Sequence, residues 1–136
     1  MRAAVRGRVR PAAREGVGLV ADDADGVAFI PRALAYLEPS VCRSLYRITF
    51  ERKLGPRDDA AFAITVLAHE AVHLRGVRNE AETECQALLE GVALGERLGL
   101  DAGTARALMH FQRDRDLSDE SIARLDYRLP TDCAAR

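Results

Sequence analysis

Apolar residues recur along most of this chain with the spacing of buried or amphipathic helices. The clearest segment is 57–75, where an apolar stretch without glycine or proline follows Asp58 and Asp59. Acidic residues favour the N-terminal end of a helix because they interact with its dipole. Arg75 and Gly76 are typical of a helix end. The pattern therefore predicts a largely buried helix over residues 57–75.

A second helix is predicted to begin a few residues later. Asn79 is a favourable N-cap residue, and Glu82 stands at the capping-box position three residues after it. The helix is expected to run over residues 80–98, because Gly99 then ends it. Since so few residues join the two segments, we expect the helices to form an antiparallel hairpin.

The rest of the pattern predicts further helices and a small amount of strand. Two short apolar runs, 17–20 and 27–30, flank a turn-rich segment, which is typical of a β-hairpin. Such a hairpin could hold an extended substrate at its edge or simply cap the helical core. Residues 31–37 suit either a strand or a helix. We therefore expect a mainly α fold, α+β at most. The further helices are expected over residues 38–54, over residues 101–111 with Asp101 as cap, and over residues 119–127 with Ser118 as cap.

The length of 136 residues suits one domain with a single core. A hydrophobic content of 48% indicates a folded chain and argues against disorder. Residues 1–16 carry five arginines and are expected to form a flexible basic arm. The expected domain is 17–130, followed by a tail over 131–136. Because the arm is atypical as the start of a domain, the chain could also be part of a longer precursor.

Charge and hydropathy limit the function classes. The net charge of −1 gives no electrostatic case for a nucleic-acid partner. No apolar run approaches the roughly 20 residues that a membrane-spanning helix needs. The N-terminal segment also lacks the apolar region of a secretory signal. These observations predict no membrane span and favour a cytoplasmic location.

The three cysteines are scattered, without the C-x-x-C spacing of a cysteine zinc site. Cys85 falls within the predicted second helix, where it is expected to be a small core residue. Cys42 and Cys133 could pair in an oxidising compartment, but spacing alone does not show that they are close.

The most informative segment is His69-Glu70-Ala71-Val72-His73, near the end of the first predicted helix. Residues four apart lie on one helix face, so both imidazoles can bind one metal ion. Glu70 lies beside them, where it could hold a water molecule at that metal. This is the H-E-x-x-H arrangement of zinc hydrolases.

The predicted hairpin adds two carboxylates to this face. The last turn of the first helix meets the first turn of the second, which places His73 near Glu80 and His69 near Glu84. Glu80 is therefore a candidate third zinc ligand. Glu84 could accept the free N–H of His69, because metal-bound histidines usually donate that group to a second partner.

Together, His69-Glu70-Ala71-Val72-His73 and Asn79-Glu80-Ala81-Glu82-Thr83-Glu84 resemble the gluzincin class of zinc metallopeptidases, which pairs H-E-x-x-H on one helix with N-E-x-x-x-D/E on the next. The resemblance covers about residues 65–90. It implies a zincin-like helical domain, Zn²⁺ held by His69, His73 and Glu80, and Asn79 and Glu84 as the partners of His73 and His69. The short spacer departs from large gluzincins and indicates a minimal zincin. Gly76 also fits the metzincin pattern, but Asn79 stands where that pattern has its final histidine.

The resemblance implies hydrolysis of a peptide or protein substrate by a zinc-bound water, with Glu70 as the general base. A further group would stabilise the oxyanion. His110 is one candidate for this role, although a histidine between Met109 and Phe111 can also be a core or surface residue. The other candidates are Tyr36, Tyr46 and Tyr127.

Two other interpretations remain open. The short chain leaves little material for a general substrate cleft, so the protein could bind zinc without general protease activity. Alternatively, the two histidines could bond to carboxylates without metal, in a helical domain that binds other proteins. Activity on an unstructured peptide pool and zinc content distinguish these interpretations.

Overall fold

The computed structural model describes residues 25–118 and 128–133 of the chain, and within them the fold is mainly helical. This confirms the predicted fold class, including an antiparallel hairpin ahead of the helices. The elements in order are β1 (Gly26–Phe29), a single 3₁₀ turn (Ile30–Arg32), β2 (Leu34–Leu37), α1 (Pro39–Thr49), α2 (Arg57–Leu74), α3 (Glu80–Arg97) and α4 (Ala102–Ser118).

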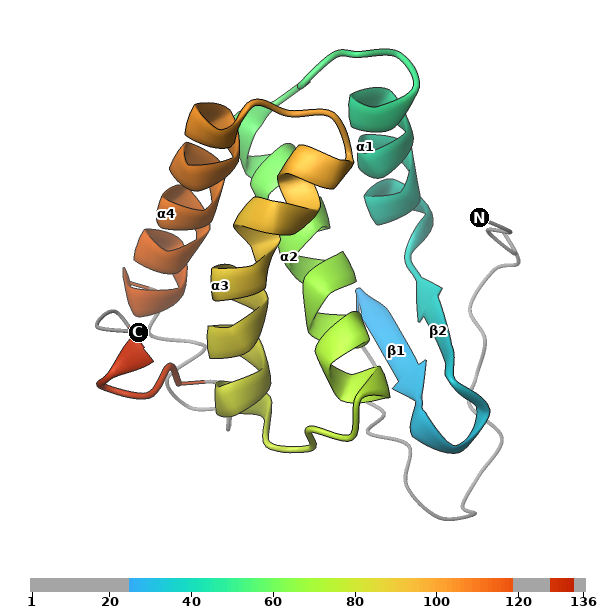
Figure 1. Cartoon of the computed structure of the whole chain (residues 1–136), viewed down its shortest axis with the longest axis vertical. Coiled ribbons are helices and arrows are strands. Elements are labelled where there is room, and N and C mark those ends of the chain that lie inside the picture. Colours follow the sequence, from blue (N-terminus) through green and yellow to red (C-terminus); the bar gives the residue numbers. More distant parts are fainter. Residues whose placement is uncertain (1–24, 119–127, 134–136) are drawn as a thin grey trace.

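Helix α2 is the central element of the fold. It packs against α1, α3 and α4, and β1 runs beside its C-terminal half (Figure 1). Its N-terminal half presents small side chains, which let the neighbouring helices approach closely. The main core is formed by Val41, Leu45 and Ile48 of α1, Ala60, Ala61, Ala63 and Ile64 of α2, and Leu108 and Met109 of α4.

Helices α2 and α3 form the predicted antiparallel hairpin (Figure 1). Only residues 75–79 join them, and Gly76 adopts a φ of 98° in the turn, which favours glycine. The Oδ1 atom of Asn79 accepts a hydrogen bond of 2.8 Å from the backbone N–H of Glu82, so Asn79 is the N-cap of α3. The short turn fixes which residues of the two helices face each other.

The β-hairpin differs from the predicted one. The run 27–30 was expected to pair with residues 17–20, which lie outside the described residues. Instead β1 pairs with β2, with Gly26 opposite Leu37 and Phe29 opposite Leu34. The sequence did not indicate this pairing because its turn lies at Ile30–Arg32 and Ala33, and alanine at a φ of 47° is not a usual turn signal. The predicted pairing with residues 17–20 is not tested by the described residues.

Two helix ends were also predicted incorrectly. Helix α1 ends at Thr49 rather than near residue 54, since the chain turns at Arg52, whose φ is 56°. Helix α4 runs to Ser118 instead of ending near residue 111. The predicted helix over 119–127 lies outside the described residues.

A disulfide joins Cys85 of α3 to Cys133, with Cα atoms 5.7 Å apart. The two cysteines form a small apolar cluster with Leu88 and Leu129. The pairing considered between Cys42 and Cys133 is therefore wrong, because Cys42 is a free thiol whose Sγ donates to the Leu37 carbonyl. The first residues of the expected tail are thus held against α3.

No helix within residues 25–118 and 128–133 is long and apolar enough to cross a membrane.

Candidate metal centre

Three side chains converge at the base of the α2–α3 hairpin. The Nε2 atoms of His69 and His73 lie 3.0 and 3.3 Å from the Oε2 atom of Glu80. One ligand atom from each residue falls within 4.8 Å of the others. The spacing of four residues stacks the imidazoles on one face of α2, and the short turn brings the first residue of α3 opposite them. The three predicted ligands are therefore found together.

The other nitrogen of each imidazole has its own partner. His69 Nδ1 lies 2.6 Å from Glu84 Oε2, as the hairpin geometry predicted. His73 Nδ1 lies 2.7 Å from the carbonyl oxygen of Val77. When Nδ1–H donates in both rings and Nε2 carries no proton, each Nε2 has a lone pair directed toward the shared point. This is the tautomer that a metal ligand requires.

The role assigned to Asn79 by resemblance needs correction. Val77 provides the partner of His73, through its backbone carbonyl, and the Asn79 side chain is engaged as the N-cap of α3. The physical reason is the five-residue turn, which brings the backbone of residue 77 against the ring of His73. A backbone carbonyl has no sequence signature, so the motif did not reveal it.

Glu70 is buried beside the cluster. It is only 5% exposed, and its Oε2 atom has no hydrogen-bond partner among the described residues. Burial raises the pKa of its carboxyl, although the charges of His69 and His73 oppose that shift. A buried carboxylate oxygen without a partner costs free energy, so its retention beside three convergent ligand atoms points to a use for it.

Strand β1 lies directly over Glu70. A Cβ atom placed on Gly26 would come within 2.8 Å of both Cγ and Oε1 of the Glu70 side chain. No other residue fits here without moving that carboxylate. The glycine therefore lets the strand backbone reach the face of α2 that carries the candidate site.

The charges within the cluster are strongly coupled. Burial lowers the pKa of His69, but its hydrogen bonds to the acceptors Glu80 and Glu84 outweigh this effect and raise the pKa to about 9. Burial raises the pKa of Glu80, but His69 and His73 reverse this and lower it to about 2. The two carboxylates thus favour a positive charge at the point where the three side chains meet.

The donor set fits a divalent transition metal. Two imidazole nitrogens and one carboxylate oxygen match the ligands of catalytic zinc sites. The same set also binds Fe(II) in other proteins, so it is not specific to one metal. The orphaned Glu70 oxygen provides the polar group that a catalytic metal site needs next to its open position.

Helix α4 contributes two residues that the sequence did not indicate. The pKa of Asp116 is raised, first by burial and then by its charge interaction and hydrogen bond with Glu84. Gln112, one turn earlier, donates a hydrogen bond of 2.9 Å from Nε2 to Asp116 Oδ1. No motif marks either residue, and only their spacing of four on one helix face could have linked them.

Three of the proposed oxyanion stabilisers lie among the described residues, and all three side chains are exposed. His110 is exposed on α4. Tyr36 is 37% exposed and packs edge-on against Phe29, at 5.6 Å between ring centroids. Tyr46 is 56% exposed and lies on α1. Tyr127 falls outside the described residues.

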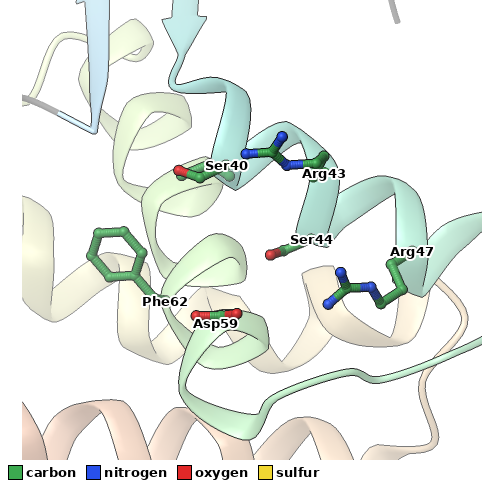
Figure 2. Close-up of a pocket in the computed structure, with 7 residues that line it drawn as sticks. Ser40, Arg43, Ser44, Arg47, Asp59 and Phe62 are labelled. Carbon is green, nitrogen blue, oxygen red and sulfur yellow. The ribbon is translucent and has the colours of Figure 1, made fainter.

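A separate pocket of about 160 Å³ lies between α1 and the N-terminal half of α2. Figure 2 shows Ser40, Arg43, Ser44 and Arg47 of α1 facing Asp59 and Phe62 of α2. None of the cluster residues lines it, so this pocket is distinct from the candidate metal centre.

Comparison with known proteins adds no relative: no protein-family model, curated protein or solved structure matches this chain. The site must therefore be interpreted from its own geometry.

Proposed function

We propose that this protein is a minimal, gluzincin-like zinc metallopeptidase. The observation that carries the proposal is the convergence of His69 Nε2, His73 Nε2 and Glu80 Oε2 beside a buried and unpaired Glu70 oxygen. A structural histidine–carboxylate cluster would not need this last group. The pairing of H-E-x-x-H with a following glutamate favours a hydrolase over the oxygenases that use the same donor set.

In this proposal His69, His73 and Glu80 hold the metal, and Glu84 and Val77 orient the two rings. Zinc, when bound, supplies a water of near-neutral pKa and polarises the substrate carbonyl. Glu70 takes the proton of the attacking water and delivers it to the leaving amine. Its raised pKa suits this work, since a base that accepts and returns a proton acts best near the working pH.

Strand β1 provides a candidate substrate-binding element. It packs on α2 through Gly26 and pairs on one side with β2, so alternate backbone groups face its other edge. An extended peptide could add to such an edge by backbone hydrogen bonds. The hairpin would then hold the scissile bond near Glu70, in addition to covering the helical core.

The low exposure of the site favours a second candidate, a zinc-binding protein without general protease activity. The His69 side chain is 12% exposed, that of His73 7% and that of Glu80 10%. A peptide must displace β1 or enter beside it to reach Glu70. A protein substrate that matches this narrow entry, or no substrate at all, would fit the same geometry.

Metal content provides the first test. The wild-type chain, Glu80→Ala and Glu84→Ala are purified without chelator or histidine tag and measured by plasma mass spectrometry across the transition metals. We expect about one zinc per wild-type chain, loss of metal in Glu80→Ala, and weaker binding, by about 10–100-fold, in Glu84→Ala. A wild-type chain that takes up no zinc, even when zinc is added, would contradict the hydrolase and leave a helical interaction domain.

Turnover separates the two zinc-binding candidates. Wild type and Glu70→Gln, both zinc-loaded, are incubated with an unstructured peptide pool, and new N-termini are identified by mass spectrometry. We expect cleavage by wild type and a loss of about 10²–10⁴-fold in Glu70→Gln, which keeps its zinc. Equal activity in the two proteins would exclude Glu70 as the base, and no cleavage by either would favour the binding-only protein.

The disulfide bears on location. Disulfides persist mainly in oxidising compartments. The buried bond between Cys85 and Cys133 therefore favours such a compartment over the cytoplasm that the sequence suggested. Quantifying free thiols in protein isolated from its native source under alkylating conditions would decide between the two.

A further inference from the structure

The last turns of α4 lie beside the N-terminal half of α3 (Figure 1). Gln112 is 5% exposed and directs its Nε2 atom to Asp116 Oδ1, at 2.9 Å. The Asp116 Oδ2 atom is buried and accepts no hydrogen bond from any described donor. Asp116 therefore has a hydrogen-bond donor at Oδ1 and none at Oδ2 among the described residues.

The neighbour of that second oxygen is another acid. Asp116 and Glu84 interact both by charge and by a hydrogen bond between their side chains. Two ionised carboxylates are both acceptors only, so a hydrogen bond between them requires one proton. Glu84 already accepts a hydrogen bond from His69 Nδ1 at 2.6 Å, so it is the acceptor of the carboxyl pair as well. The proton therefore belongs on Asp116, where burial also favours the neutral form.

We propose that Asp116 is a positioning residue of the metal centre: as a neutral carboxyl it donates a hydrogen bond to Glu84 and so fixes Glu84 against the ring of His69. The proposal rests on the proposed function for its effect on zinc. It extends the support of one ligand outward, from His69 through Glu84 and Asp116 to Gln112, across three helices.

The chemistry of this chain of contacts is specific. Glu84 has rotatable bonds that one hydrogen bond to His69 does not fix, and a second donor removes that freedom. The proton on Asp116 also keeps a further negative charge away from a cluster that already contains Glu70, Glu80 and Glu84. The positive charge of Arg115 lowers the pKa of Asp116. This effect is smaller than the rise caused by burial and by Glu84.

The first experiment tests the proton without any metal. Aspartate side-chain carboxyl carbons are labelled with ¹³C in the full, zinc-free chain, and the Asp116 signal is assigned by its loss in Asp116→Asn. We expect Asp116 to remain protonated at about pH 5.5, where an ordinary aspartate with a pKa of about 3.9 is almost fully ionised. Asp114, whose side chain is 72% exposed on the same helix, provides the internal reference signal. An ionised Asp116 would overturn the proposal.

The second experiment measures zinc affinity by competition with a coloured chelator. Asp116→Asn keeps a neutral donor in the same shape, so its affinity should stay within about twofold of wild type. Asp116→Ala removes the donor and should weaken binding about tenfold, at the lower end of the effect of a ligand's partner. The matched controls Asp114→Asn and Asp114→Ala should change nothing.

A double substitution shows whether the effect passes through Glu84. In a Glu84→Gln background, Asp116→Ala should add less than about twofold, because its route to His69 is already lost. The positioning role would be overturned if Asp116→Ala weakened zinc binding as much in the Glu84→Gln background as in wild type. It would also be overturned if Asp116→Asn and Asp116→Ala weakened zinc binding equally, or if neither changed it. A wild-type chain that binds no zinc but keeps its proton on Asp116 would contradict the proposed function alone, since the carboxyl pair would stand.

Discussion

Both halves of α2 carry buried residues, but the chemistry of the two halves is opposite. In the N-terminal half, Ala60, Ala61, Ala63 and Ile64 are at most 1% exposed and belong to the main apolar core. At the other end Glu70 and His73 are each 5% exposed and meet ionisable groups. One helix therefore carries a hydrophobic core at one end and a polar core at the other.

The difference shows what each end is built for. Apolar burial stabilises the fold by roughly 25 cal/mol for each Å² removed from water. Burying a polar group costs free energy unless the group is hydrogen-bonded. Glu70 Oε2 has no hydrogen-bond partner among the described residues. The polar end therefore gains nothing in stability from holding Glu70 where it does, which is the pattern expected of a functional site.

The largest change in stability is expected at the apolar end. Ile64→Ala leaves a cavity in the main core and should lower the free energy of unfolding by about 2–5 kcal/mol, without changing zinc affinity. Urea unfolding and chelator competition measure the two effects. Leu117→Ala, at a residue 62% exposed on α4, is the control and should change stability by less than about 0.5 kcal/mol. A matching loss of zinc affinity in Ile64→Ala would show that the two ends are not independent.

The polar end should respond to pH instead. The folded pKa of His69, about 9, lies above its ordinary 6.5, so the stabilisation is complete below pH 6.5 and lost as pH rises through about 9. The loss should be about 3 kcal/mol, from the size of that shift. Urea unfolding of the chelator-treated chain across this range measures it. His69→Gln should remove most of the dependence, and a flat wild-type profile would contradict the coupling.

A smaller effect is expected where β1 meets the polar end. Gly26→Ala should push the Glu70 carboxylate from its position and lower kcat about tenfold, which corresponds to about 1.4 kcal/mol. Zinc affinity should be unchanged, because the three atoms nearest to the added Cβ all belong to Glu70 and none to a ligand. Gly103→Ala is the matched control, since that glycine is exposed in the first turn of α4. Unaltered turnover in Gly26→Ala would mean that Glu70 is not held by the strand.

The smallest effect concerns the cap of α3. Asn79→Ala should cost about 1 kcal/mol of stability and leave zinc affinity intact, because Val77 orients His73. Asp101→Ala, which removes the same kind of cap from α4, should cost a similar amount in thermal unfolding. If Asn79→Ala weakened zinc binding tenfold while Asp101→Ala did not, the side chain of Asn79 would act on His73 after all.

Sequence reasoning succeeded where the signal is local. The bounds of α2 and α3 were predicted to within about one residue, because Gly76, Asn79 and Gly99 mark the ends by backbone geometry. The positions of Glu80 and Glu84 followed from the short turn and helical spacing. Everything that was predicted at the metal centre lies within a few turns of the motif.

Sequence reasoning did not predict contacts between residues far apart in the sequence or contacts made by backbone atoms. The bond between Cys85 and Cys133 joins residues 48 apart, and no spacing rule selects that pair. Asp116, which Gln112 contacts, reaches Glu84 only because α4 packs on α3. Val77 acts through its carbonyl, which every residue possesses.

The short spacer between the two motifs has a consequence for folding. All three candidate ligands lie between residues 69 and 80, so the centre has a very low contact order. The chain entropy lost in closing so short a loop is small, and loops of about ten residues close in about 10–100 ns. A metal ion can therefore join α2 to α3 before α1 docks or the Cys85–Cys133 bond forms, which would make the metal an early organiser of the fold.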